Sequence, residues 1–324
     1  MDRDKASYAD MLAVLEAKKG DSEQDFKDAF EQLYLYTRQT YQMQHNLRFA
    51  WGLTVCGRKV CVIHFGPDRA TASPIIDVGT PEGRQALIGL FVNCALCEYA
   101  QLGRDPTIRR LDSLNCWEID CPDDTGDTTG GTVVKYYYSK VYFAADRVFG
   151  RHTRCFLAAS KMPTVAVSES NPLIPDIIVK DAWAYAHRIP AKDIRDEVKG
   201  LRSIDSEFPE GVDTGFIVPR IKAGGRVYFE LNGKRVEDNT DTMYGKPPEL
   251  VEDNTDTMDE RPTEPVVDNG DTRYKNLYDP CLFRTHRRIA TSPIGEPLAE
   301  VKSIAEFVTV VCDVMVFHYE LVRR

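Results

Sequence analysis

The chain of 324 residues lacks long hydrophobic runs, and its longest uncharged apolar stretch, Gln85 to Cys97, has only 13 residues. A helix needs about 20 apolar residues to cross a bilayer. We therefore expect no membrane span. The first residues, MDRDKASYADM, carry charges where a secretory signal would have an apolar run. Nine cysteines cannot all pair with one another, so an intracellular location, cytoplasmic or nuclear, is favoured.

A concentrated basic stripe is also missing. The chain has 41 basic and 50 acidic residues, a net charge of -9. Twelve of the acidic residues lie between positions 236 and 271 beside two basic ones, so the remaining residues together are close to neutral. Proteins that bind nucleic acid concentrate lysine and arginine on one surface. Nucleic acid is therefore not an expected partner.

Several catalytic and metal-binding motifs are absent as well. The sequence contains no G-x-S-x-G, no H-E-x-x-H and no Walker lysine motif. Cys94 and Cys97 form a C-x-x-C, but no second pair completes a set of four zinc ligands. This pair lies in the apolar run LFVNCALCEYA, so we expect both cysteines to be buried as small hydrophobic residues and predict no metal site.

The residues that are present predict a folded α+β protein, since 43% are hydrophobic and 10% aromatic. Apolar residues recur at helical spacing in the first 45 residues, including Tyr8, Met11, Leu12 and Leu15, and again in 83–102. Between these two helical regions, FAWGLTVCGRKVCVIHF has the composition of a β-hairpin. LNCWEI and VVKYYYSKVYFA are typical of strands, and they flank a stretch rich in Gly, Asp and Thr.

An internal repeat marks the acidic segment 236–271, because VEDNTDTM occurs at Val236–Met243 and again at Val251–Met258. The segment has too few apolar residues to offset the entropy of ordering, so we interpret it as a disordered insertion. Thr242 and Thr257 are candidate phosphate acceptors; a tolerated insertion without function is the alternative.

Three residue types in a particular order carry the candidate chemistry. VFGRHTRCFLAAS places a glycine turn between two strand-like runs, DIIVKDAW places Lys180 in a strand, and AKDIRDEVKGLR places Glu197 on a helix. A glycine turn can cover phosphates, a fixed cation can neutralise them, and a carboxylate can hold that cation. The alternative is a plain hairpin with two solvated charges.

The sequence also resembles the fungal-type protein kinase family over most of its length. The strings that carry the resemblance are NLRFAWGLTVCGRKVCVIHF (46–65), LGRDPTI (102–108), FGRHTRCF (149–156), IIVKDAW (177–183) and THRRIATSPIGEPL (285–298). The resemblance implies an N-terminal αβ extension in 1–140. It implies a kinase-like domain in 141–324, with an antiparallel small lobe, one helix and an incomplete large lobe.

The same resemblance implies an ATP site. Gly150, Arg151 and Thr153 would form the turn that covers the nucleotide, Lys180 would face its phosphates, and Glu197 would hold that lysine. His152 departs from the pattern, since it stands where a second glycine is expected, and its side chain would keep the backbone away from phosphates. We expect His152 to be a surface histidine.

The groups that perform phosphoryl transfer are missing from these residues. No H-R-D loop and no D-F-G motif occurs, and His286-Arg287-Arg288 has a cation where the proton-accepting carboxylate is required. We therefore predict no catalytic residues, and magnesium only if a large lobe is supplied. The expected function is that of a pseudokinase, a nucleotide-binding or interaction module. The alternative is the N-terminal part of an active Ser/Thr-type kinase.

An apolar stripe marks the last predicted helix, 303–322, where Ser303 is a candidate N-cap and Glu306 follows three residues later. A bare apolar stripe is typical of an interface. We expect this helix to pack on the small lobe, on a second copy or on a protein partner.

Overall fold

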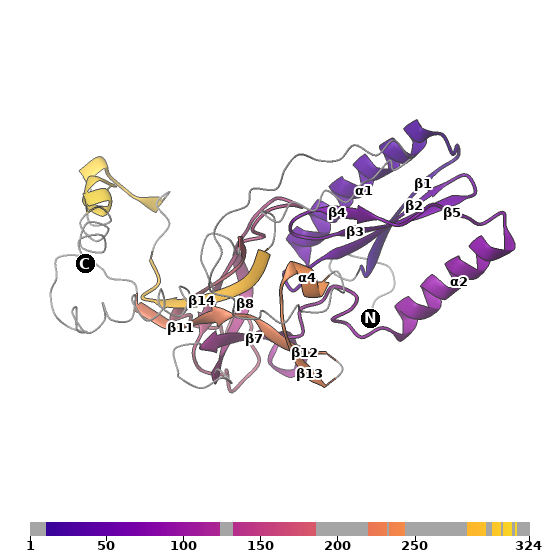
Figure 1. Cartoon of the computed structure of the whole chain (residues 1–324). Helices are drawn as coiled ribbons and strands as arrows, with labels where there is room; N and C mark the ends of the chain where they lie inside the picture. Colours follow the sequence, from indigo (N-terminus) through magenta and orange to yellow (C-terminus); the bar gives the residue numbers. More distant parts are fainter. Residues whose placement is uncertain are drawn as a thin grey trace, which may run out of the picture.

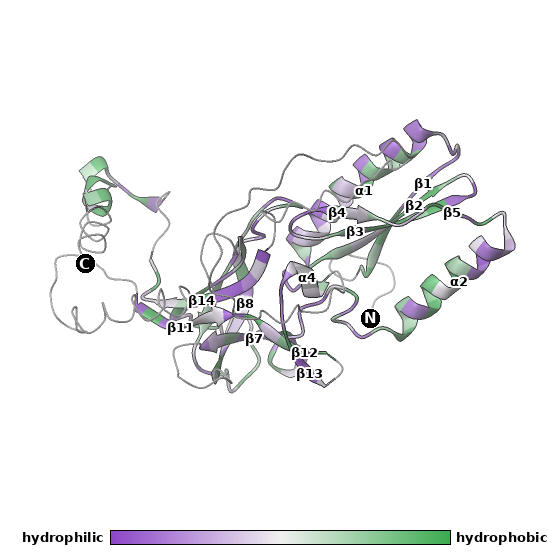
Figure 2. Cartoon of the chain, in the orientation of Figure 1, coloured by the Kyte–Doolittle hydropathy of each residue, from purple (hydrophilic) through white to green (hydrophobic). Residues whose placement is uncertain are grey.

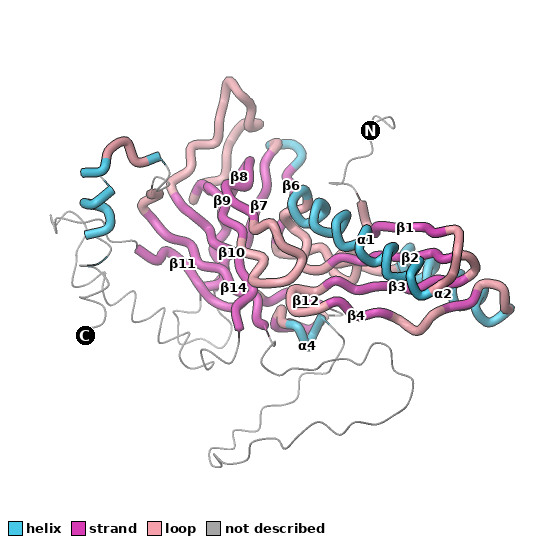
Figure 3. Tube along the Cα trace, turned by 90° about the horizontal axis from the view of Figure 1, so that it is seen from above, coloured by secondary structure: helices cyan, strands magenta, loops and turns pink. Residues whose placement is uncertain are grey.

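The computed structural model describes residues 11–123, 132–185, 220–231, 233–243, 284–295, 300–305, 307–312 and 315. Within these residues the protein is a mixture of helices and a larger number of strands, which confirms the α+β class. A small N-terminal unit and a β-barrel lie side by side (Figures 1 and 3). No helix among the described residues is long and apolar enough to cross a membrane.

A twisted sheet and a helix form the N-terminal unit. The sheet has the order β1–β2–β3–β4, and β5 also pairs with β3. Its strands are β1 (Ala13–Lys18), β2 (Ala50–Cys56), β3 (Lys59–Phe65), β4 (Ala70–Ala72) and β5 (Ile76–Asp77). The predicted hairpin is therefore confirmed as β2 and β3, with Gly57 in the left-handed conformation at the turn.

Helix α1 (Glu23–Met43) covers one face of this sheet. It begins after a capping box, in which Ser22 and Asp25 cap each other's backbone amides. Leu33 is fully buried against Gly52 of β2, where even a Cβ atom would come within 3.2 Å of the leucine side chain. This close approach of helix and sheet fixes the core of the unit.

The expected helix around Leu12 and Leu15 is wrong for residues 13–18, which form β1. β1 pairs in parallel with β2 from Ala13↔Trp51 to Lys18↔Cys56. Leu12 and Leu15, on which the helical spacing depended, are both exposed, whereas Val14 between them is buried, and pairing with β2 gives the segment its extended conformation. Residues 1–10, which include Tyr8, lie outside the described part of the chain.

The second predicted helix is confirmed as α2 (Pro81–Leu96), capped by Thr80. It contacts the rest of the unit little. Its apolar residues, coloured green on the ribbon of Figure 2, are largely exposed. Cys94 is exposed and Cys97 is intermediate, so the expectation that both are buried is wrong. The helix is apolar on all sides, and its composition alone did not determine which side faces the sheet.

The second sheet has the order β11–β14–β10–β9–β8–β7–β6, and a parallel bridge from Gly224 to Asp123 joins β11 to β7. Six described strands, β7 to β11 with β14, thus close into a barrel, where the resemblance implied an antiparallel small lobe with one helix. The bounds are β6 (Ile108–Leu111), β7 (Cys116–Asp123), β8 (Thr132–Ala144), β9 (Arg154–Ala159), β10 (Ile177–Tyr185), β11 (Arg220–Arg226) and β14 (Arg284–Ser292).

Strand β8 crosses position 140, where the sequence placed a domain boundary. It pairs with β7 on one side and β9 on the other, so strands from both sides of that position share one sheet. The predicted domain limits stay a prediction. The helix expected around Glu197 lies outside the described residues.

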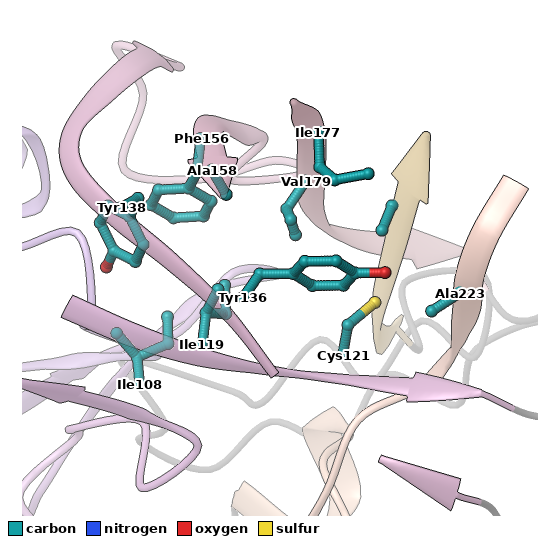
Figure 4. Close-up of a cluster of buried hydrophobic side chains, with 11 residues drawn as sticks. Ile108, Ile119, Cys121, Tyr136, Tyr138, Phe156, Ala158, Ile177, Val179 and Ala223 are labelled. Carbon is teal, nitrogen blue, oxygen red and sulfur yellow. The ribbon is translucent and has the colours of Figure 1, made fainter. Parts of the chain in front are cut away.

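The barrel core contains aromatic and β-branched side chains from its strands. Figure 4 shows the ring of Tyr136 between Val179 and Cys121, with Tyr138 packed on Phe156. These side chains are at most 2% exposed. Alternate residues of each strand point inward, as the two-residue period of a strand requires.

The first copy of the acidic repeat is ordered, so the expectation of disorder is wrong for residues 236–243. Val236 lies in β13 (Lys234–Glu237), which pairs with β12 (Tyr228–Leu231), and α4 (Thr240–Met243) follows. Asp238 between them is fully buried and paired with cations. The second copy, at 251–258, lies outside the described residues.

Gly103 gives a test of this fold. Its φ is 95°, and a Cβ atom would lie 2.2 Å from the carbonyl oxygen of Phe49. We expect Gly103→Ala to lower the free energy of unfolding by about 2 kcal/mol, measured by urea denaturation. Gly89→Ala is the matched control, since nothing lies within 4 Å of its Cβ position in α2. It should stabilise by up to about 1 kcal/mol. Equal effects of the two substitutions would contradict the fold.

Candidate functional site

The two faces of β10 carry the charged residues that define the candidate site. Val179, Asp181 and Trp183 point into the barrel and are fully buried. Lys180, between them, is exposed on the outer face. The alternation of a strand therefore separates a carboxylate inside the barrel from an ammonium outside it.

Inside the barrel, Asp181 is surrounded by cations. Its Oδ1 accepts hydrogen bonds from His286 Nε2 at 2.6 Å and from Arg288 Nε at 2.8 Å. Arg154 Nη1 lies 3.6 Å from Oδ2. A buried carboxylate is stable only when it is paired in this way.

His286 connects two carboxylates. Its Nδ1 lies 2.8 Å from Asp238 Oδ2, while its Nε2 is bonded to Asp181. The imidazole ring also stacks on Trp183, with ring centroids 4.7 Å apart and planes 4° from parallel. Both ring nitrogens donate to carboxylates in the protonated form, and this arrangement favours the charged imidazolium.

Arg288 continues the network from Asp181 toward the loop before β6. Its Nη2 donates to Asp105, and its Nη1 donates to Thr107 Oγ1 at 2.5 Å and to the carbonyl of Asp120 at 2.7 Å. Asp105 also accepts a 2.9 Å bond from the amide of Thr107. The guanidinium is fully buried, and its bonds tie β14, β10, β7 and this loop together.

Two further arginines join the network to the N-terminal unit. Arg48, just before β2, donates to Asp238 at 2.7 Å and to the carbonyl of Ala100 at 2.8 Å. Arg154 of β9 donates to the carbonyl of Leu47 at 2.7 Å. We call the set of buried charges Arg48, Asp105, Arg154, Asp181, Asp238, His286 and Arg288 the charge network.

The protonation states follow from these contacts. Burial alone would lower the pKa of His286, but Asp181 and Asp238 outweigh it and raise the pKa to about 9. Burial would raise the pKa of Asp181, but His286, Arg288 and Arg154 hold it well below its usual range. Asp105 has a lowered pKa because Arg288 outweighs its burial. At neutral pH His286, Asp181 and Asp105 are therefore charged.

The charge network is a structural element of the barrel. Asp181 and Arg288 have no exposed surface, and His286 has almost none, so no substrate can reach them. Removing one partner of a buried ion pair leaves an uncompensated charge, which typically costs about 3–5 kcal/mol. Among the described residues, no group of three or more His, Cys, Asp or Glu is placed to hold a metal ion.

The outer face around Lys180 is apolar and open to solvent, unlike the charged interior. Lys180 is paired across the sheet with Cys155 of β9 and Ile289 of β14. Ile178, two residues earlier on the same face, is paired with Leu157. These neighbours are only partly buried, so the ammonium stands on an apolar surface that is open to solvent.

A second cation lies on this face, because Arg287 is paired with Ala182, two residues beyond Lys180. Burial raises the pKa of the Cys155 thiol, although Lys180 opposes this effect. An apolar surface with flanking cations can bind a flat ring and an attached anion.

The predicted turn lies between β8 and β9. Gly150 has a φ of 132°, which only glycine adopts easily, and its amide donates to the carbonyl of Pro67 at 2.8 Å. The carbonyl of Arg151 accepts from the amide of Trp183 at 2.7 Å, and that of Thr153 accepts from Ala145 at 2.9 Å. The turn is thus attached to β10, the strand of Lys180.

His152 is not a surface residue, contrary to the prediction. It is 4% exposed, has a φ of 42°, and its ring lies 4.5 Å from that of Tyr41. Burial, with Arg154 nearby, lowers its pKa to about 3, so the ring is neutral.

The structure therefore places Gly150, Arg151 and Thr153 on a turn bonded to β10, and it places Lys180 on the outer face of that strand. Glu197 lies outside the described residues. The role of these five residues in binding stays a prediction. Sequence reasoning missed the charge network, although alternate residues of the strand-like run THRRIA supply His286 and Arg288 to it.

Comparison with known proteins gives one match. A family model described as fungal protein kinase matches residues 1–324, the whole chain. No curated protein and no solved structure matches.

The pH dependence of stability tests the charge network. Because the pKa of His286 rises from about 6.5 in the unfolded chain to about 9, its stabilisation is complete below pH 6.5 and is lost as the pH rises through 9. We expect a loss of about 3 kcal/mol over this range. Histidines 45, 64 and 152 have pKa values lowered by burial to about 3, so above pH 7.5 they are neutral in both states.

The comparison is made with His286→Gln by urea denaturation between pH 7.5 and 9.5. The variant should be less stable at pH 7.5, and its stability should fall less steeply with pH. A direct check is the NMR titration of the His286 ring in the folded protein. Parallel curves for the two proteins, or a titration near pH 6.5, would show that the imidazole is not held charged.

Proposed function

The chain belongs to the fungal protein kinase family, and from that premise we propose that its outer face around Lys180 is the phosphate-facing wall of an ATP site. Strands β8, β9, β10, β14 and β11 follow one another in antiparallel pairing. In this proposal they correspond to a kinase small lobe, which the additional strand β7 closes into a barrel.

The observation that carries the proposal is the orientation of Lys180. It is the exposed charged residue of β10, between the apolar Ile178 and the small Ala182 on the same face. In a protein kinase the strand lysine neutralises ATP phosphates, and a carboxylate from the following helix holds it. Lys180 points away from the charge network, so it is available for a ligand on the outer face.

The turn of Gly150, Arg151 and Thr153 would lie at one end of this wall. Its attachment to Trp183 places it three residues along β10 from Lys180, which is about 10 Å in a strand. Glu197 would supply the carboxylate, and magnesium would bind if a large lobe supplies its ligands. The apolar side chains of Leu157 and Ile289 would contact the adenine ring.

We propose that this polypeptide by itself binds nucleotide or a partner and does not transfer phosphate. The sequence contains neither H-R-D nor D-F-G, so both the proton acceptor and the magnesium ligands are missing. The alternative is that it is the N-terminal part of an active ATP-dependent kinase, and the match to the family model is compatible with both.

A role in protein interaction has its own supporting observation. Ile304, Phe307, Val308 and Met315, in the segment that the sequence predicted as a helix, are largely exposed. The amide of Phe307 donates to the carbonyl of Ser303, as at the start of a helix. This stripe would be covered by a large lobe, a second copy or a protein partner.

Nucleotide binding is tested by thermal shift with ATP, with and without magnesium. A ligand at 100 times its Kd stabilises the folded state by about 2.7 kcal/mol, and the wild-type melting temperature should rise accordingly. Lys180→Met should raise the Kd for ATP at least about tenfold. Lys161→Met, which removes an exposed lysine just after β9, is the matched control. Equal shifts for Lys180→Met and wild type would contradict the site.

Catalysis is tested with radioactive ATP and a general protein substrate. We expect the 324-residue polypeptide to label no substrate above background. Loss of the general base alone costs a factor of about 10² to 10⁴, and the metal ligands are missing as well. Labelling that Lys180→Met abolishes and Lys161→Met retains would show that the chain itself is an active kinase.

A further inference from the structure

The turn between β8 and β9 is inserted into the N-terminal unit. Val148 is fully buried and belongs to the same apolar cluster as Leu33 of α1 and Phe65 of β3. Phe149 packs beside it, with its ring centroid 5.8 Å from that of Tyr34. The hydrophobic part of the turn thus lies in the core of the other unit.

Polar contacts fix the rest of the turn. The amide of Gly150 donates to Pro67 O at 2.8 Å, and the ring of His152 lies against Tyr41. Tyr41 in turn donates from its hydroxyl to the carbonyl of Phe65 at 2.7 Å. The backbone of the turn is therefore held from the side of α1 and β3.

One contact of the turn, the ion pair between Asp146 and Arg38, is exposed to solvent. Asp146 forms a two-point ion pair with Arg38 of α1 and accepts a 2.7 Å bond from Gln42 Nε2. The side chains of Arg38 and Asp146 are 44% and 43% exposed. This pair can open without exposing Val148, whereas the apolar contacts cannot be broken without opening the core.

We infer that α1 is a positioning element for the turn 145–153, and that the Arg38–Asp146 pair is a latch that holds the solvent-exposed first part of the turn, next to the buried Val148, in place. The effect of the latch on ATP rests on the proposed function. A turn that is already ordered loses less conformational entropy when a ligand binds to it. Opening the latch therefore weakens nucleotide binding, and closing it strengthens binding.

A purely electrostatic role of Asp146 makes a different prediction. If the charge of Asp146 acted directly on the phosphates, removing Arg38 would weaken ATP binding and removing the carboxylate would strengthen it. A latch requires both partners, so both substitutions must act in the same direction. The sign of the two effects separates the alternatives.

The experiment measures amide hydrogen exchange of residues 145–153 and the Kd for ATP in Arg38→Gln, Asp146→Asn and the exchanged pair Arg38→Asp/Asp146→Arg. We expect faster exchange and a Kd about threefold higher in each single variant, within the range of exposed ion pairs. In the double variant with the two charges swapped, the rate of hydrogen exchange and the Kd should both return most of the way to their wild-type values. Arg58→Gln is the matched control, because it removes an exposed ion pair with Asp77 in the same unit.

Unchanged exchange in the single variants would overturn the latch, as would opposite effects of the two substitutions on the Kd. Equal changes in Arg58→Gln would also overturn it, because they would show a general loosening of the unit. If the wild-type protein binds no ATP, the proposed function fails. In that case the latch would still be supported if hydrogen exchange is faster in the single variants and returns to the wild-type rate in the double variant with the charges swapped.

Discussion

The burial of a carboxylate inside the barrel is the constraint on which the rest of the structure depends. Asp181 has no exposed surface, and a lone carboxylate in that position would not be tolerated. His286 and Arg288 of β14 meet it with 2.6 and 2.8 Å bonds, which fixes the register of β10 against β14. Shifting that register by one residue would turn both cations out of the barrel.

Strand β10 carries both the buried carboxylate of Asp181 and the candidate binding residue Lys180. With Asp181 fixed inside, Lys180 must project from the outer face, where Ile178 and Ala182 flank it. The charge network also reaches the N-terminal unit through Arg48. This contact and the inserted turn both attach that unit to the barrel, so the unit can influence the face that carries Lys180.

Local patterns predicted part of this architecture. The hairpin of β2 and β3 and strand β8 follow from β-branched and aromatic runs around turns, and α1 follows from the helical spacing of its apolar residues. The strand at 13–18 could not be predicted, because its conformation depends on pairing with β2, more than 30 residues away in the chain. Asp238 looked like part of a solvated acidic segment, since the sequence does not show that Arg48, 190 positions away, pairs with it.

The most direct test of the central claim is a double-mutant cycle between Asp181 and Arg288, measured by urea denaturation at pH 7. We expect Asp181→Asn and Arg288→Met each to destabilise the protein by about 3–5 kcal/mol, because each leaves a buried charge without its partner. The double variant should be more stable than the sum of the two losses predicts, by 1 kcal/mol or more, on the order of the coupling seen for contacting residues. Additive losses would show that the two charges do not hold β10 and β14 together, and they would contradict the orientation of Lys180 that follows from that pairing.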